Sequence, residues 1–117
     1  MKDTKAIQSL AAEFEACQKI LTALGDEVRQ HLILQMMSHG TDCSGMRVPE
    51  ITELTHLSRP AVSHHLQILK DAGIMKMRRE GTMNYYYFAY DNSIEKLITA
   101  LQHASEIIRA LPDRSGE

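Results

Sequence analysis

The chain has 117 residues, of which 44% are hydrophobic and 24% charged, and this suits one globular domain with one core. No apolar run approaches about 18 residues and the start of the chain lacks a signal-peptide apolar region, so we expect no membrane span and a cytoplasmic protein. The net charge of −2 excludes a uniformly basic nucleic-acid binder, but between Arg59 and Arg79 five basic residues stand against one acidic residue. This basic centre predicts contact with a polyanion through one face of the molecule.

The first predicted element is a helix over residues 5–24. Its apolar residues recur at intervals of three and four, close to a heptad repeat, and such a long stripe requires a partner helix. These residues are Ile7, Leu10, Phe14, Cys17, Leu21 and Leu24.

A second helix is predicted over residues 27–39, after a break at Gly25 and with Asp26 as its cap. Its apolar residues should make it the central helix of the core. They are Val28, Leu32 and Met36 on one face, with Ile33 and Met37 beside them.

Two short helices joined by a turn of a few residues follow. Residues 40–45 have the composition of a loop, and residues 46–48 could form a short strand. The two helices are predicted over residues 49–56 and 59–72. Together they are typical of a helix-turn-helix unit whose second helix reads DNA.

The second of these helices has clear ends and two distinct faces. Ser58 is a suitable N-cap, Pro60 suits the first turn, and Gly73 suits the C-terminal end. The predicted buried stripe consists of Val62, Leu66 and Leu69. The first turn and the opposite face carry groups suited to base edges and phosphates. These predicted DNA contacts are Ser58, Arg59, Pro60, Ser63, His64, Gln67 and Lys70.

His65 lies nearer the buried side of the same helix. Two interpretations are open for its imidazole: a DNA contact, or a side chain that is packed or bonded to the backbone.

A β-hairpin is predicted over residues 74–90, with strands at 74–79 and 85–90 and turn residues Gly81 and Asn84 between them. Its first strand is basic, which suits a hairpin, or wing, lying beside a phosphate backbone. The predicted wing contacts to DNA are Arg78, Arg79, Thr82 and Tyr85. The tyrosines at 85–87 could stack on bases, but a strand of this kind more often buries alternate rings in the core.

The last predicted helix covers residues 92–111, with Asp91 as its N-cap. Its apolar face consists of Ile94, Leu97, Ile98, Leu101, Ala104, Ile108 and Leu111. A small core cannot cover two long terminal stripes, so we expect them to pair across a two-fold axis in a homodimer. The predicted dimerisation residues are Ile7, Leu10, Phe14, Leu21, Ile94, Leu97, Leu101 and Ile108.

Three segments resemble the ArsR/SmtB family of winged-helix transcriptional regulators: GDEVRQHLIL at 25–34, SRPAVSHHLQILKDAGIM at 58–75, and RREGTMNYYYF at 78–88. The resemblance covers nearly the whole chain and implies a single winged helix-turn-helix domain over residues 1–117, mainly α with a small β-hairpin. It also implies a homodimer on a palindromic operator in double-stranded DNA, with repression relieved by an inducer, often a metal ion.

The residues do not match the metal sites of this family. Many metal-sensing members have a cysteine-rich stretch at the start of the first short helix, where this chain has MRVPEITEL with Arg47 near the ligand position. Another group binds zinc between the C-terminal helices, and Asp91, His103 and Glu106 resemble part of that set. Ser93 replaces its first histidine, and the spacing from Asp91 to His103 is one residue off, which turns a helix by about 100°. We therefore predict no metal site, with these three residues as weak candidates.

Two cysteines, Cys17 and Cys43, are too few for a disulfide framework or a closed zinc site, so reduced thiols are expected. Sensing of oxidants would require an exposed, activated thiolate, and no basic cluster lies near Cys43 in the sequence. The seven methionines are expected to fill the core.

The sequence therefore predicts a dimeric, sequence-specific DNA-binding regulator, most simply a repressor with an unidentified small inducer. The alternatives are a winged-helix protein-interaction module without DNA binding and a metal- or thiol-responsive member of the same family. The sequence shows no nucleophile–base pair, phosphate-cradling glycine loop or paired-carboxylate motif, so we expect neither catalysis nor a cofactor.

Overall fold

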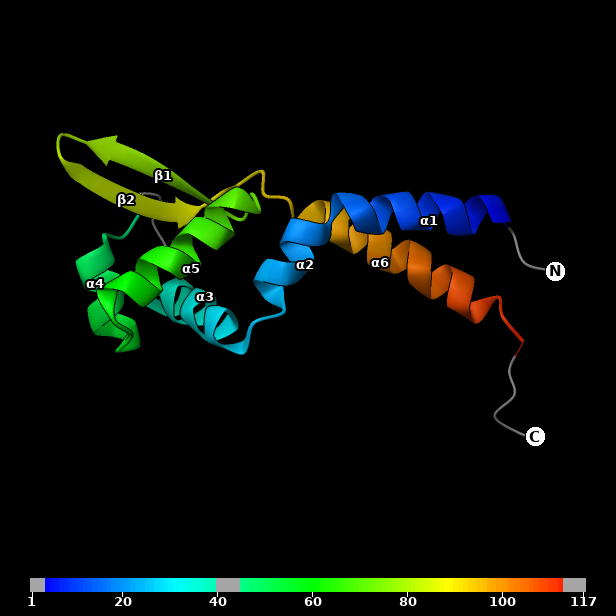
Figure 1. The fold of residues 1–117 in the computed structure, drawn as a ribbon, viewed down its shortest axis with the longest axis horizontal. Helices are drawn as coiled ribbons and strands as arrows, with labels where there is room; N and C mark the ends of the chain where they lie inside the picture. The colour runs from blue at the N-terminus through cyan, green and yellow to red at the C-terminus, as the bar shows by residue number, and fades with distance from the viewer. Residues whose placement is uncertain (1–3, 40–44, 113–117) are drawn as a thin grey trace.

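The computed structural model describes residues 4–39 and 45–112. Two long helices, α1 (Thr4–Ala16) and α6 (Ile94–Arg109), lie side by side and project from one end of the rest of the chain (Figure 1). We call this pair the arm. No helix in the described residues is both long enough and apolar enough to cross a membrane.

The prediction of one continuous helix over 5–24 is wrong, because the structure has two helices there. The chain turns at Cys17, and a separate short helix, α2 (Gln18–Leu24), leads from the arm into the rest of the molecule. The turn lets α1 lie along α6 while α2 buries Ile20 and Ala23 in the core. The apolar spacing continues unbroken across Cys17, so the periodicity alone did not reveal the turn.

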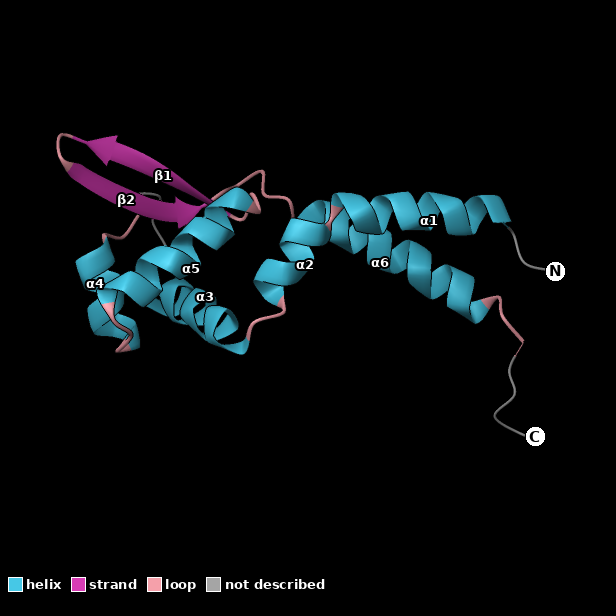
Figure 2. Cartoon of the chain, in the orientation of Figure 1, coloured by secondary structure: helices cyan, strands magenta, loops and turns pink. Residues whose placement is uncertain are grey.

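The predicted helix-turn-helix and hairpin are confirmed, with small shifts of their ends. Beyond α2 lie α3 (Glu27–His39), α4 (Val48–Thr55) and α5 (Arg59–Asp71). The hairpin follows as β1 (Met75–Glu80) and β2 (Met83–Phe88), an antiparallel pair that lies beside α5 (Figure 2). The loop predicted over 40–45 lies, apart from Gly45, outside the described residues.

The second strand begins two residues earlier than predicted. Glu80 pairs with Met83, so only Gly81 and Thr82 form the turn, and Gly81 has a φ of +62°, which glycine adopts without strain. Asn84 is therefore a strand residue opposite Arg79 rather than a turn residue. At the other end the strand stops at Phe88, and Tyr90 is fully exposed. The possible strand at 46–48 is reduced to an isolated bridge between Met46 and Tyr86.

The core lies between α2, α3, α4, α5 and the base of the hairpin. The predicted stripe of α5, Val62, Leu66 and Leu69, is fully buried. On α3 the prediction is confirmed for Leu32, Ile33 and Met36 but wrong for Val28 and Met37, which are 44% and 49% exposed. Arg29 occupies the buried face in place of Val28, because its guanidinium finds polar partners inside the fold.

The start of α6 is fixed to the end of α5. The Ser93 hydroxyl donates to the carbonyl of Ala72, and the Ser93 amide donates to the carbonyl of Gly73 at 3.2 Å. Gly73 has a φ of +79° and ends α5 as predicted. The predicted N-cap Asp91 is wrong: the Asn92 side chain accepts from the Ile94 amide, and Asp91 pairs with Lys76 instead. The helix is also shorter than the predicted 92–111 at both ends.

The N-cap of α5 gives a first testable prediction. The Ser58 hydroxyl accepts a hydrogen bond from the Ala61 amide at 3.3 Å, as the sequence predicted. Replacing Ser58 with alanine removes this bond and should lower the free energy of unfolding by about 1 kcal/mol in urea denaturation. Ser63→Ala on the exposed face of the same helix is the control and should cause no loss. Equal stability of Ser58→Ala and the unmodified protein would contradict the cap.

Candidate nucleic-acid interface

The exposed face of α5 carries the predicted reading residues together. Ser63, His64, Gln67 and Lys70 are all exposed, and Arg59 and Pro60 are exposed at the start of the helix. Because Val62, Leu66 and Leu69 anchor the opposite face, these side chains are held outward on a rigid element. This arrangement is suited to inserting a helix into a DNA major groove.

Gln67 is engaged within the free protein. Its amide nitrogen donates to a carboxylate oxygen of Asp71 at 2.8 Å, one turn further along α5. Contact with a base would therefore exchange this exposed hydrogen bond for one to the base edge.

The cations of the hairpin also have intramolecular partners. Arg78 bonds to Glu80 at 3.1 Å, and its guanidinium lies 4.9 Å from the centre of the Tyr85 ring. Arg79 donates from Nε to the carbonyl of Gly81 at 3.1 Å. These contacts fix both guanidinium groups along the hairpin, with Thr82 exposed at its tip.

Alternate rings of β2 face the core, as predicted. Tyr86 and Phe88 pack against the buried cluster, whereas Tyr85 lies on the side of Arg78. The Tyr85 hydroxyl is directed to the sulfur of Met83 at 3.7 Å. Tyr85 is thus placed beside the cationic strand rather than within the core.

His65 has a partner that the sequence did not suggest. Its Nδ1 lies 3.3 Å from Nη1 of Arg29, a buried residue of α3. The imidazole is half-buried and turned towards Arg29 rather than the reading face. The interpretation of a packed side chain is therefore confirmed, and its bonding partner is a side chain rather than the backbone. The sequence signal was available: an arginine stands among the apolar residues of α3 at the spacing of Leu32, Ile33 and Met36.

Two of the three weak metal candidates, Asp91 and His103, are engaged elsewhere. Asp91 pairs with Lys76 at 3.0 Å, and this hydrogen bond lowers the pKa of Asp91 and raises the pKa of Lys76. His103 bonds to Glu13 of α1 at 2.9 Å, and Glu106 is exposed. Within the described residues, no three His, Cys, Asp or Glu side chains come together to hold a metal ion. Cys17 is buried, at 1% exposure, and Cys43 lies outside the described residues.

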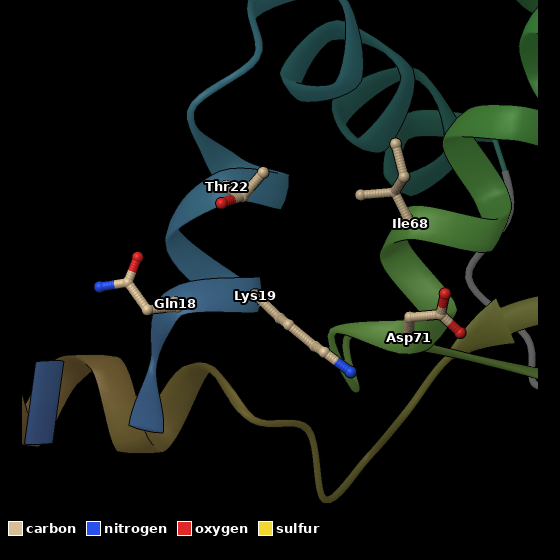
Figure 3. Close-up of a pocket in the computed structure, with 5 residues that line it drawn as sticks. All are labelled: Gln18, Lys19, Thr22, Ile68 and Asp71. Atoms are coloured by element: carbon tan, nitrogen blue, oxygen red, sulfur yellow. The ribbon is translucent and has the colours of Figure 1, made fainter. Parts of the chain in front are cut away.

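A groove of about 270 Å³ separates α2 from α5 (Figure 3). It is lined by Gln18, Lys19, Thr22, Ile68 and Asp71, and most of its surface is apolar. Asp71 is the residue that holds Gln67, so the groove adjoins the reading face of α5.

The predicted dimerisation residues divide into two groups within one protomer. Leu97 is buried in the protomer's own core, and Phe14, Leu21 and Ile94 pack against that core. Ile7, Leu101 and Ile108 are 41%, 49% and 65% exposed, and Leu10 is half-buried. Ile98 and Leu111, at 43% and 45%, extend the exposed apolar surface of the arm.

Comparisons with known proteins agree with this architecture. The pattern that defines the family described as "bacterial regulatory protein, arsR family" matches residues 29–76, from the start of α3 into β1. An HTH-type transcriptional regulator of Methanocaldococcus jannaschii is 35% identical over 86 residues, which cover 74% of this chain and 91% of the relative. The transcriptional repressor SmtB of Mycobacterium tuberculosis is 33% identical over 92 residues, 79% of this chain and 64% of the relative.

A solved structure shares the fold. The homodimeric winged helix-turn-helix DNA-binding domain of a possible ArsR-family regulator from Mycobacterium bovis aligns with a TM-score of 0.59 at 21% identity. The alignment covers 89% of this chain and 93% of that domain. From the matched pattern and the relatives together, this chain belongs to the ArsR family of helix-turn-helix transcriptional regulators.

Proposed function

We propose that the chain is a homodimeric repressor that binds a palindromic operator in double-stranded DNA and is released by an inducer. The observation that carries this proposal is the exposed face of α5, where Ser63, His64 and Gln67 stand outward from a helix anchored in the core. In this proposal α5 of each protomer enters a major groove.

The side chains on α5 suit the two kinds of contact that such a helix makes. Gln67 can bond to adenine through both atoms of its amide, and Ser63 and His64 can each donate to or accept from base edges. Arg59 stands at the N-terminus of α5, where the helix dipole also favours a phosphate. Ser58 and Pro60 would lie against the DNA backbone at the same end of α5. Lys70, in the last turn of α5, would contact another phosphate.

The wing would follow the phosphate backbone beside the groove. Arg78 and Arg79 supply the charge, Tyr85 supplies a hydroxyl next to Arg78, and Thr82 stands at the tip. Thr82 carries no charge, so the tip would contribute little to reading the minor groove.

The homodimer is supported by the exposed apolar surface of the arm and by the homodimeric state of the related M. bovis domain. Repression is supported by the named role of the related SmtB protein. The family membership does not favour a protein-interaction module without DNA binding, and it supports a regulator rather than an enzyme.

A salt series tests the proposal directly. The probe is a labelled duplex of the region immediately upstream of the protein's own gene, and binding is followed by fluorescence anisotropy. We assume one phosphate contact for each of four basic residues in both protomers: Arg59, Lys70, Arg78 and Arg79. A plot of the logarithm of the binding constant against the logarithm of the salt concentration should then have a slope of about −7.

Arg79→Gln should reduce the magnitude of this slope by about 2, one phosphate per protomer. Arg109→Gln, at the far end of the arm, is the matched control and should leave the slope unchanged. Binding that does not depend on salt, or no preference for the upstream duplex over a scrambled one, would overturn the proposed function.

A further inference from the structure

Arg29 occupies an unusual position for an arginine, at 6% exposure in the first turn of α3. Its guanidinium donates from Nε to the carbonyl of Ala23 at 2.9 Å and from Nη2 to the carbonyl of Thr22 at 3.0 Å. Both carbonyls belong to the last turn of α2, where no intrahelical donor is available. The arginine therefore caps the C-terminal end of α2 from the helix that follows it.

The remaining nitrogen, Nη1, faces α5. It lies 3.3 Å from Nδ1 of His65 and 3.6 Å from a carboxylate oxygen of Asp26. One side chain thus connects three elements: α2, which continues from the arm, α3, and the helix that carries the reading residues. His65 directly follows His64 on α5, so the position of its ring is tied to the position of the reading face.

The contact requires a neutral histidine. A guanidinium is a donor only and stays charged in proteins, so the Nδ1 of His65 must accept, with the ring proton on Nε2. A protonated imidazole has donors at both nitrogens. Protonation would therefore remove the hydrogen bond and leave two cations in contact.

The surroundings of His65 favour the neutral ring. Burial is the main cause of a lowered pKa for His65, and the positive charge of Arg29 adds to it. Asp26 acts in the opposite direction, and the neighbouring His64 ring, 5.9 Å away between centroids, lowers the pKa further. The α2 helix contributes the carbonyls of Thr22 and Ala23 to Arg29, while its Lys19 lines the groove beside Asp71.

We propose that Arg29 and His65 form a pH-sensitive positioning contact, which holds α5 against the corner between α2 and α3. Protonation of His65 breaks this contact and thereby weakens operator binding. This inference rests on the proposed function. His65 is a positioning residue here, since it faces Arg29 rather than the reading surface.

The direction of the pH effect on stability follows from the lowered pKa of His65. The folded protein binds this proton less readily than the unfolded chain, whose histidine has a pKa of about 6.5. The stabilising contribution of the neutral contact is complete above that value. It is lost as the pH falls from there through the lowered pKa of the folded state.

The test uses His65→Gln, because the glutamine carbonyl can accept from Arg29 but does not titrate. Anisotropy with the upstream duplex is measured at pH 7.5 and 5.5 at fixed salt for both proteins. Effects of acid on the rest of the protein and on the duplex are common to both proteins, so the informative quantity is the ratio of their affinities. We expect the affinity of the unmodified protein to fall relative to His65→Gln on going to pH 5.5, by up to about tenfold, the limit set by the ordinary histidine pKa of about 6.5. His31→Gln, at an exposed histidine of α3, is the control and should keep the unmodified profile.

A second readout does not depend on DNA. Urea unfolding at the two pH values should show a loss of stability in acid for the unmodified protein that His65→Gln lacks, and NMR titration should place the pKa of His65 below 6.5. Parallel pH profiles of the two proteins in both measurements would overturn the contact. If neither protein binds the duplex at any pH, the proposed function fails, while the unfolding comparison still decides the role of Arg29 and His65.

Discussion

Replacing Ser63, His64 and Gln67 together with alanine should lower the affinity for the operator by about 100-fold or more, towards that for unrelated DNA. Each good base contact discriminates by about 1–3 kcal/mol, and the dimer would present each contact twice. The phosphate contacts remain in this variant, so binding that ignores sequence should persist and keep its salt dependence. Titration of the operator and of a scrambled duplex by anisotropy measures both effects.

The fold should tolerate this triple change. All three side chains are exposed, and alanine is the better helix former at each position. The hydrogen bond from Gln67 to Asp71 is lost, but it lies at the surface and contributes little to stability. Sedimentation and thermal unfolding should therefore match those of the unmodified protein.

A matched control exists on another helix. Gln30, His31 and Ser38 are the same three residue types on the exposed face of α3, and their joint replacement with alanine should leave operator affinity unchanged. If the Ser63–His64–Gln67 variant still distinguishes the operator from the scrambled duplex, α5 is not the reading element.

The reading helix was the most predictable part of the molecule because every local signal agreed there. Ser58 caps it, Gly73 ends it, and the stripe of Val62, Leu66 and Leu69 fixes which side is outward. Sequence alone therefore placed Ser63, His64 and Gln67 on the exposed face. The same consistency held for the hairpin, whose glycine turn and alternating rings were visible, although its second strand lies two residues earlier than predicted.

The features that the sequence did not reveal are those set by contacts between distant segments. The turn at Cys17 depends on α1 packing along α6, more than 70 residues away, and the apolar spacing does not record it. The buried Arg29 depends on carbonyls of α2 and on His65, 36 residues further along, so a pattern of apolar residues placed Val28 in the core instead. Asp91 similarly stands where the local sequence predicts a helix cap, but its carboxylate pairs with Lys76 instead.

Replacing Leu101 and Ile108 with lysine should convert the protein from dimer to monomer and lower operator affinity by about 100-fold or more, since a monomer keeps only half of the contacts. These residues are seven apart on α6 and are 49% and 65% exposed in the protomer, so the changes should leave the protomer fold intact. In a two-fold interface the same patch serves both subunits, so the lysines would be buried on both sides of the interface without a partner charge.

Lysine is chosen because it adds positive charge, and a loss of DNA binding can then not be attributed to repulsion from phosphates. The control is Thr99→Lys with Glu106→Gln, which adds the same net charge at exposed positions on the other side of α6. Sedimentation velocity and anisotropy with the operator measure the two effects on the same samples. A Leu101 and Ile108 variant that remains dimeric would show that the exposed apolar surface of α6 is not the interface. A monomer that binds as tightly as the control would show that the two reading helices do not act as a pair.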